Sequence, residues 1–173
     1  MNNNIKEVIV SAENSSVEVR YKFLKRFQEG NPTRDEESKT HFCVYFLPYN
    51  KAEKKVFIVH HKKANLWIFP GGHIGKGEVP IEALEREIKE ELGVIYKAEE
   101  NAVPFLLTIT PIDNIRQICK AHYDIWYLMP TDGSNFNVDP AEFHETRWVT
   151  IGDAYNLVTE PSNLEALNIL KKL

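Results

Sequence analysis

The chain has 173 residues, of which 43% are hydrophobic and 27% are charged, and its formal net charge is -4. These values are typical of one globular domain, and they argue against disorder, a membrane protein or a basic surface for nucleic acid. Two cysteines, Cys43 and Cys119, are too few for a disulfide scaffold or an all-cysteine zinc site. Without a recognisable signal peptide or membrane span, we expect a cytoplasmic protein with no membrane partner.

The N-terminal part of the chain is predicted to form one amphipathic helix over residues 17–27. Its apolar residues recur at helical spacing, and they are Val17, Tyr21, Leu24 and Phe27. Gly30 supplies a stop signal. The polar stretch 31–39 that follows is typical of a surface connection. We therefore divide the chain into an N-terminal helix with its connecting segment, residues 1–37, and a main domain, residues 38–173.

The main domain combines predicted strands with a few predicted helices. Runs of β-branched and aromatic residues predict strands, which are residues 41–47, 55–60, 66–69, 105–110, 121–129 and 147–150. A helical period appears over 80–92, with Pro80 suited to the first turn and Gly93 to the position after the last. A second helical period covers 164–173. Because strands and helices do not alternate regularly, we expect an α/β fold with a mixed sheet packed between helices.

The predicted helix over residues 80–92 carries an excess of carboxylates. On a helical projection Glu87, Glu90 and Glu91 share a face, beside the apolar stripe that would pack on the sheet. Like charges at this spacing repel unless a cation lies among them, and hard oxygen ligands suit Mg²⁺ or Mn²⁺. Most acidic helix faces are simply solvated surface. The four glycines of the preceding segment FPGGHIGKGE favour the metal site, because they let the backbone approach an ion or a phosphate closely.

Specified residues follow one another at fixed spacings in the segment 72–94. Glu78 follows Gly72 after five residues, and seven residues later the groups Arg86-Glu87-Ile88, Glu90-Glu91 and Gly93-Val94 are each separated by one residue. This pattern resembles the Nudix box of MutT-like hydrolases at every defining position, and the flanking strands resemble the Nudix α/β/α sandwich. The resemblance implies a hydrolase that cleaves a pyrophosphate linkage in a nucleoside diphosphate derivative with Mg²⁺, or with Mn²⁺ in its place.

The resemblance also implies roles for particular residues. The groups that would hold the metal or orient the attacking water are Glu87, Glu90, Glu91 and the carbonyl of Gly71. Arg86 and Glu78 would position the glycine-rich loop on the helix, because a guanidinium can hold carboxylates through paired hydrogen bonds. Many family members draw a further carboxylate from a segment ahead of a late tryptophan. Glu142 and Glu145, which precede Trp148, are therefore candidates for a metal ligand or a distal base, with an ordinary surface position as the alternative.

A nucleotide substrate needs an apolar slot and positively charged groups, and these would lie outside the box. Trp67 and Phe69 are candidates for contact with a base, and Lys63 and His73 are candidates for contact with phosphates. Aromatic residues on strands are more often buried in a core than stacked on a base. The expected partner is a small nucleoside diphosphate derivative rather than nucleic acid. A homodimer contact through the N-terminal helix is a further option.

Two other functions stay open. An isopentenyl-diphosphate isomerase shares the fold but uses a catalytic cysteine, whereas Cys43 and Cys119 lie in strand-like runs where a buried, inert thiol is usual. A non-catalytic nucleotide-binding domain of the same fold is the second alternative. Only the hydrolase predicts that changing Glu90 or Glu91 to Gln abolishes magnesium-dependent turnover.

Overall fold

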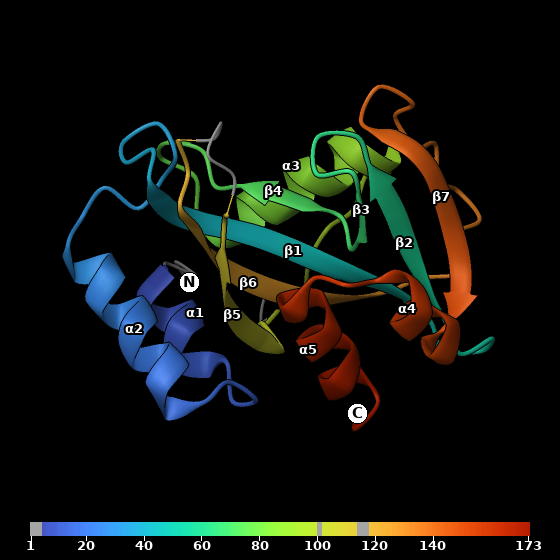
Figure 1. The fold of residues 1–173 in the computed structure, drawn as a ribbon, viewed down its shortest axis with the longest axis horizontal. Coiled ribbons are helices and arrows are strands. Elements are labelled where there is room, and N and C mark those ends of the chain that lie inside the picture. Colours follow the sequence, from blue (N-terminus) through green and yellow to red (C-terminus); the bar gives the residue numbers. More distant parts are fainter. Residues whose placement is uncertain (1–4, 100–101, 114–117) are drawn as a thin grey trace.

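The computed structural model describes residues 5–99, 102–113 and 118–173. In this part of the chain, seven strands form one sheet with the order β3-β2-β1-β6-β5, while β4 also pairs with β1 and β7 pairs with β2. Helices cover both faces, so the fold is the expected α/β/α sandwich (Figure 1). The elements in chain order are α1 (Ile5–Ser11), α2 (Val17–Gln28), β1 (Thr40–Asn50), β2 (Lys55–His61), β3 (Leu66–Ile68), β4 (Gly71–His73), α3 (Pro80–Leu92), β5 (Leu106–Pro111), β6 (Ala121–Pro130), β7 (Phe143–Thr150), α4 (Ile151–Leu157) and α5 (Pro161–Leu170).

The sheet is mixed, as expected from the irregular order of strands and helices. β1 and β6 run parallel, and their register extends from the pair Thr40 and Ala121 to the pair Tyr49 and Pro130. The other strand pairs are antiparallel. A parallel pair needs a long crossover connection, and here the connection carries β2, β3, β4, α3 and β5. The central strand β1 therefore meets segments that lie far away in the sequence.

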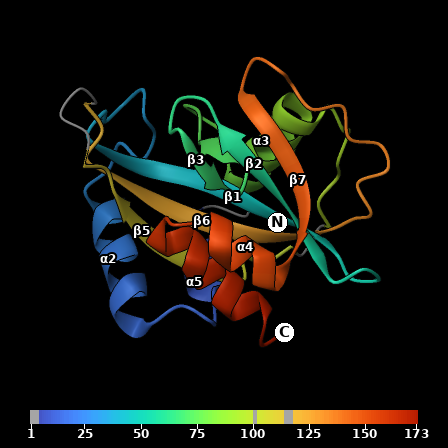
Figure 2. The same cartoon turned by 45° about the vertical axis from the view of Figure 1, so that its right-hand side comes forward.

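Each face of the sheet has its own hydrophobic core. Val44 of β1 packs in one core cluster with Ile88 of α3 and Phe23 of α2. Leu47, an odd-numbered residue of β1, packs in the other cluster with Leu167 of α5. This division follows from the pleat, which points successive side chains to opposite faces. Figure 2 shows α4 and α5 in front of the sheet and α3 behind it.

The N-terminal helices meet the sheet differently from the sequence expectation. The expected apolar face of α2 was partly wrong, because Val17 and Tyr21 are 76% and 67% exposed. The buried residues of α2 are Phe23 and Arg26. The edge of the Phe23 ring meets Phe42 of β1, with ring centroids 5.7 Å apart. The contact with β1 is thus made by the side of α2 that carries Phe23, and α1, which the sequence did not predict, packs in the same core.

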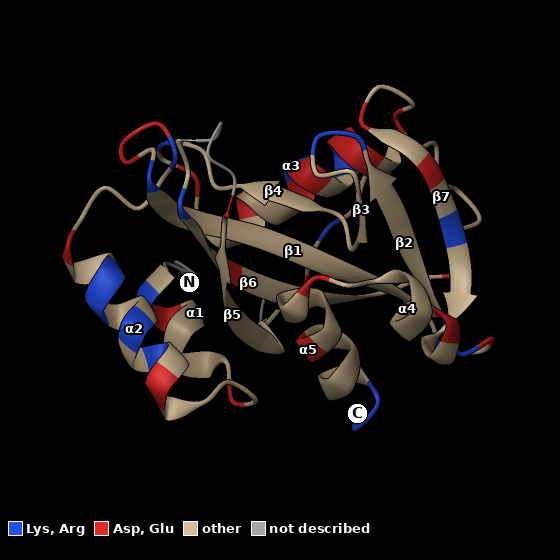
Figure 3. Cartoon of the chain, in the orientation of Figure 1, with Lys and Arg blue, Asp and Glu red and all other residues tan. Residues whose placement is uncertain are grey.

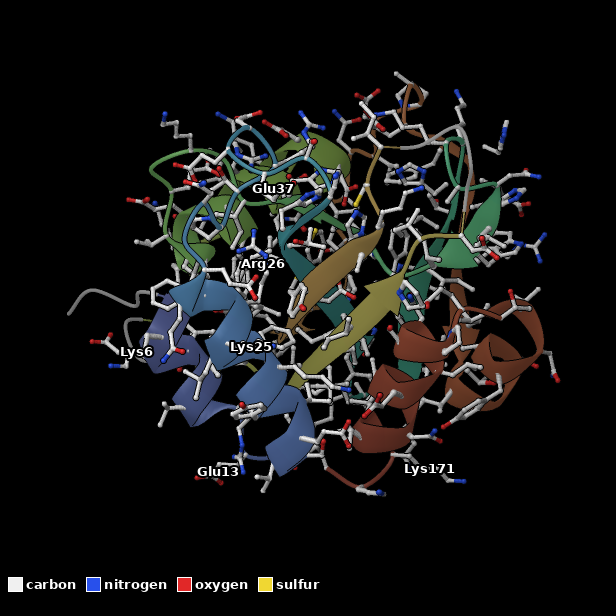
Figure 4. All side chains as sticks on the ribbon, turned by 60° about the vertical axis from the view of Figure 1, so that its left-hand side comes forward. Lys6, Glu13, Lys25, Arg26, Glu37 and Lys171 are labelled. Carbon is white, nitrogen blue, oxygen red and sulfur yellow. The ribbon has the colours of Figure 1, made fainter. Side chains whose placement is uncertain are left out.

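Arg26 fastens the end of α2 to the start of β1. It is only 4% exposed. Its guanidinium donates hydrogen bonds to the carbonyl oxygens of Gly30, Asn31 and Thr40 and to the Thr40 hydroxyl, at 2.7 to 2.9 Å. These four acceptors offset the loss of hydration of a buried charge. Figure 4 shows Arg26 between the end of α2 and the loop that carries Glu37.

The helix α3 has the predicted bounds for the predicted reasons. Pro80 occupies its first turn, and Gly93 ends it in the left-handed conformation with φ of 66°. Val79 precedes the helix and has no side-chain acceptor for the first free N–H groups. The Glu82 carboxylate instead accepts a hydrogen bond from the Val79 N–H at 3.0 Å, which caps one of them.

The remaining predicted elements are present with shifted ends. The strand predicted over 147–150 begins already at Phe143, and the helix predicted over 164–173 spans Pro161–Leu170. Besides α1, the short elements β4 and α4 were not predicted. Among the described helices, none has both the length and the apolar character that crossing a bilayer requires.

Candidate active site

The carboxylates of α3 lie partly inside the protein. Leu84 and Ile88 anchor the helix on the sheet, and on the adjoining side Glu87 and Glu91 are only 9% and 5% exposed. Glu90 lies on the exposed side of the same helix. Figure 3 shows acidic residues gathered on α3. The solvated-surface alternative therefore does not apply to Glu87 and Glu91.

The glycine pair at the start of β4 lets this strand fit between β1 and α3. A Cβ atom at Gly72 would lie 2.2 Å from Glu87 Oε1. At Gly71 a Cβ atom would lie 2.4 Å from the carbonyl oxygen of Val44 in β1. Any side chain at these positions would force the carboxylate or the strand to move. The glycines thus place a strand of backbone directly beside Glu87.

Arg86 ties the helix, the loop and β4 together. Its Nε and Nη2 donate to the two oxygens of Glu78 at 2.7 and 2.9 Å. Nη1 donates to Glu87 at 2.7 Å and to Glu90 at 3.1 Å. Nη2 also donates to the His73 carbonyl oxygen at 2.8 Å. Through these contacts Arg86 joins α3, the loop residue Glu78 and β4.

Charge and burial act on these carboxylates in opposite ways. Burial raises the pKa of Glu87 against the opposing effect of Arg86, and burial together with the Glu87 charge raises the pKa of Glu91 well above its usual value. The Arg86 hydrogen bonds lower the pKa of Glu78. Glu78 is therefore stabilised in its charged form by its ion pair with Arg86. The charged forms of Glu87 and Glu91 are instead disfavoured, because the two carboxylates are buried close to each other.

A divalent cation fits this arrangement. The Oε2 atom of Glu91 is buried and has no hydrogen-bond partner among the described residues. An unpartnered carboxylate oxygen beside a second buried carboxylate is costly without a cation. All side-chain donors here are oxygens, which suit Mg²⁺ or Mn²⁺ better than softer ions.

The two candidate carboxylates ahead of Trp148 differ in their surroundings. Glu142 lies just before β7, and its charge contributes to the raised pKa of Glu91. Glu145 is exposed and accepts hydrogen bonds from Arg147 at 2.6 and 3.0 Å. Glu142 is therefore the one of the two that is electrostatically linked to the α3 cluster.

The four expected substrate contacts do not gather in one place. Phe69 has no exposed surface and belongs to the core below α4 and α5, so we assign it to packing. Trp67 stacks on His60 and lies under the Arg147 guanidinium, 4.8 Å from the ring centroid. Lys63 is exposed in the turn between β2 and β3. His73 adjoins the glycine pair in β4.

Sequence reasoning missed a group of buried polar residues on the face opposite α3. Asp124 of β6 is fully buried and accepts hydrogen bonds from Thr108 and Thr110 of β5. Burial raises the pKa of Asp124 to about 7. Cys43, which pairs with Asp124 between β1 and β6, was considered only as a buried, inert thiol, and His41 of β1 was overlooked. Their separation of two residues on a strand, which puts both side chains on one face, was the available signal.

The sandwich and the buried glutamates facing a glycine pair define a Nudix-type domain. The model of the NUDIX domain family matches residues 39–172, and the chain belongs to this family. The RNA pyrophosphohydrolase of Stenotrophomonas maltophilia is 31% identical over 111 residues, which cover 57% of this chain and 54% of that protein. The chain thus spans about half the length of the curated relatives it matches.

Solved structures share the fold. A hydrolase of the NUDIX family from Clostridium perfringens is 25% identical with a TM-score of 0.59, and the match covers 76% of this chain and 96% of that one. The NUDIX domain of Shewanella oneidensis NrtR, solved with ADP ribose, is 13% identical with a TM-score of 0.62 and covers 86% of this chain and 96% of that one.

Proposed function

We propose that this protein is a magnesium-dependent pyrophosphohydrolase that cleaves a nucleoside diphosphate derivative by attack of water on phosphorus. The observation that carries the proposal is the buried pair Glu87 and Glu91, one of whose oxygens has no partner, beside the backbone at Gly71 and Gly72. Membership of the NUDIX family and the similarity to RNA pyrophosphohydrolases support it.

The proposed cation ligands come from three segments. They are Glu87, Glu90 and Glu91 of α3, the Gly71 carbonyl of β4 and Glu142 ahead of β7. A divalent ion held there would supply positive charge to the phosphate oxygens and acidify water. Mg²⁺ is the expected ion, with Mn²⁺ able to replace it. Glu90, which is exposed, is the carboxylate best placed to meet solvent and take a proton from water.

Arg86 and Glu78 are positioning residues in this proposal. Arg86 holds Glu87 and Glu90 on one side and the β4 carbonyl of His73 on the other, so it sets the position of the helix relative to the glycine pair. Glu78 neutralises Arg86 and accepts a hydrogen bond from the Gly75 N–H at 2.7 Å. The loop is thereby held in one conformation before substrate arrives.

A substrate screen tests the proposal directly. The full chain is incubated with nucleoside triphosphates, sugar nucleotides, ADP ribose, dinucleoside polyphosphates and 5′-triphosphorylated RNA, each with Mg²⁺ and with Mn²⁺, and released phosphate and nucleotide are followed. We expect turnover of at least one small nucleotide that Glu90→Gln and Glu91→Gln abolish. Glu85→Gln is the matched control, because Glu85 lies on the same helix but pairs with Lys97 at 2.7 Å.

Other outcomes of the same screen point to other functions. Tight binding of ADP ribose without turnover would replace the hydrolase with a non-catalytic binding domain. Isomerase activity that depends on a cysteine is disfavoured, since burial raises the pKa of both Cys43 and Cys119 and so keeps both thiols protonated.

A further inference from the structure

Three imidazoles and one thiol converge on the face of the sheet opposite α3. They are His41 and Cys43 of β1, His73 of β4 and His122 of β6, and their potential ligand atoms all lie within 4.8 Å of one another. The ring centroids of His41 and His73 are 4.7 Å apart, and each ring lies 5.1 Å from that of His122. None of these groups belongs to the carboxylate cluster of α3.

Strand register explains the convergence. His41 and Cys43 are two residues apart on β1, so both side chains point to the same face. In the parallel pair, His41 lies beside His122, and in the antiparallel pair, Cys43 lies beside His73. Neighbouring side chains in register share a face of the sheet. Four potential metal ligands from three strands therefore lie close together on one face of the sheet.

The cluster and the carboxylates are separated by the sheet. Phe42 and Val44, which alternate with His41 and Cys43, lie in the core cluster that contains α3. The position of a Cβ atom at Gly72 faces Glu87, so the next residue, His73, points the other way. The two groups thus occupy opposite faces of β1 and β4.

The imidazoles have lone pairs available for an ion. The Nδ1 atom of His41 lies 3.2 Å from the Glu37 carbonyl oxygen and can only donate to it, which leaves Nε2 unprotonated in the neutral ring. Glu37 is labelled in Figure 4, in the loop ahead of β1. The Nδ1 atom of His122 is buried and has no partner among the described residues. Metal-binding histidines commonly donate their second N–H to a carbonyl oxygen, as His41 does to Glu37.

We propose that His41, Cys43, His73 and His122 form a tetrahedral site for a transition-metal ion, with Zn²⁺ as the first candidate. Three nitrogens and one sulfur are a donor set that suits zinc and not magnesium. Ligand atoms around a tetrahedral zinc ion lie about 3.3 to 3.8 Å apart. The cluster, at up to 4.8 Å, therefore needs to close by about 1 Å.

Binding requires one change of protonation. The Cys43 thiol loses its proton to solvent as the sulfur–zinc bond forms, and the three neutral imidazoles coordinate without losing one. The free thiol is kept protonated by its burial, which raises its pKa. Cys119 lies at the rim, with its sulfur 3.8 Å from His41 Nε2, and is not one of the four ligands.

The site would join three strands near their ends. His41 lies close to the start of β1, His122 close to the start of β6 and His73 at the end of the short strand β4. A bound ion would hold β4 against the sheet from the side opposite Glu87. The proposed role is structural support of the segment that carries Gly71 and Gly72.

Titration of the full chain with Co²⁺ in saturating Mg²⁺ tests the proposal. We expect tetrahedral visible bands together with a sulfur-to-cobalt charge-transfer band, one Co²⁺ per chain, and displacement of Co²⁺ by Zn²⁺. Cys43→Ser removes the charge-transfer band, and His122→Gln weakens Zn²⁺ binding by at least about 100-fold. Cys119→Ser is the matched thiol control and retains the wild-type spectrum.

The outcome is independent of the proposed hydrolase activity. Glu91→Gln, which removes a proposed magnesium ligand, should leave the cobalt spectrum unchanged. No charge-transfer band in the wild type, or the same band in Cys43→Ser, would overturn the site. Circular dichroism checks that each variant is folded. If Cys43→Ser does not fold, His122→Gln decides, and Zn²⁺ binding as tight as in the wild type would refute the proposal.

Discussion

The carboxylate of Glu87 occupies the space that a side chain at position 72 would need, since a Cβ atom on Gly72 would lie 2.2 Å from Glu87 Oε1. The same oxygen accepts a hydrogen bond from Arg86 at 2.7 Å, so moving the carboxylate away from a new side chain would disturb this contact. The position of Glu87 thus depends on the absence of a side chain at position 72.

Gly72→Ala should displace Glu87 and impair the reaction while the fold is retained. We expect kcat to fall by about 100-fold, because a displacement of about 1 Å in a catalytic constellation has an effect of this size. The measurement is kcat and KM with the best substrate of the screen. Gly152→Ala in α4, where a Cβ atom has room, is the control and should keep wild-type activity. Unchanged kcat in Gly72→Ala would mean that Glu87 does not take part.

Arg86→Lys should lower kcat by about 10- to 100-fold and leave KM nearly unchanged. A lysine keeps the charge but cannot hold both oxygens of Glu78 and also reach Glu87 and the His73 carbonyl oxygen. Arg147→Lys is the matched control, since Arg147 forms a similar fork with Glu145 on the exposed strand β7. Equal effects of the two substitutions on kcat would show that the paired hydrogen bonds of Arg86 have no special role in the reaction.

Glu91→Gln should affect stability with opposite sign in the absence and presence of magnesium. Without the ion, the variant removes a buried charge and gains about 1 kcal/mol in free energy of unfolding. With free Mg²⁺ at roughly 100 times its Kd, the wild type gains about 2.7 kcal/mol and the variant gains little. Thermal unfolding of both proteins with EDTA and with Mg²⁺ measures the difference. A wild-type Tm that does not respond to Mg²⁺ would contradict the assignment.

Asp124 should make the protein less stable as the pH rises from about 4 to about 7. In the unfolded chain this carboxyl ionises near its ordinary pKa of 3.8, whereas burial raises its pKa in the folded protein to about 7. The folded state therefore binds the extra proton, and the stabilisation present at low pH is lost through this window, by about 4 kcal/mol at most. Urea unfolding of wild type and Asp124→Asn across the window measures it.

The difference in unfolding free energy between the wild type and Asp124→Asn separates the effect of Asp124 from that of the other carboxyls. Asp124→Asn should be more stable than the wild type above pH 7, and its advantage should shrink towards pH 4. The exposed substitution Asp113→Asn serves as control and should follow the wild type. A constant difference between Asp124→Asn and wild type at all pH values would show that the carboxyl is not protonated in the folded protein.

The fold was predicted best where local signals were strong. The helix α3 has its predicted ends because Pro80 and Gly93 act on the backbone directly. β4 was missed because its sequence Gly-Gly-His has no strand preference and pairs only because β1 offers a free edge. The exposed position of Tyr21 was not predictable from spacing, since the side of α2 that meets the sheet is chosen by Phe23 and its partners.

The residues of the candidate site could be proposed from the sequence, whereas their burial could not. The spacing of the box led us to propose the glutamates of α3 as ligands and Arg86 and Glu78 as positioning residues. The burial of Glu87 and Glu91 depends on how closely β4 approaches, which only the folded chain shows. The convergence of His41 with His122 depends on the parallel register of strands about 80 residues apart, for which the sequence carries no local signal.

The parallel pairing of β1 with β6 has a consequence for how the protein folds. The chain must close a loop from Thr40–Asn50 to Ala121–Pro130 before this pair can form. Closing so long a loop lowers the entropy of the chain before the stabilising contacts of the pair are made. Refolding should therefore be slow compared with that of a helical protein of equal size. A nascent chain would expose the unpaired edge of β1 until β6 has left the ribosome.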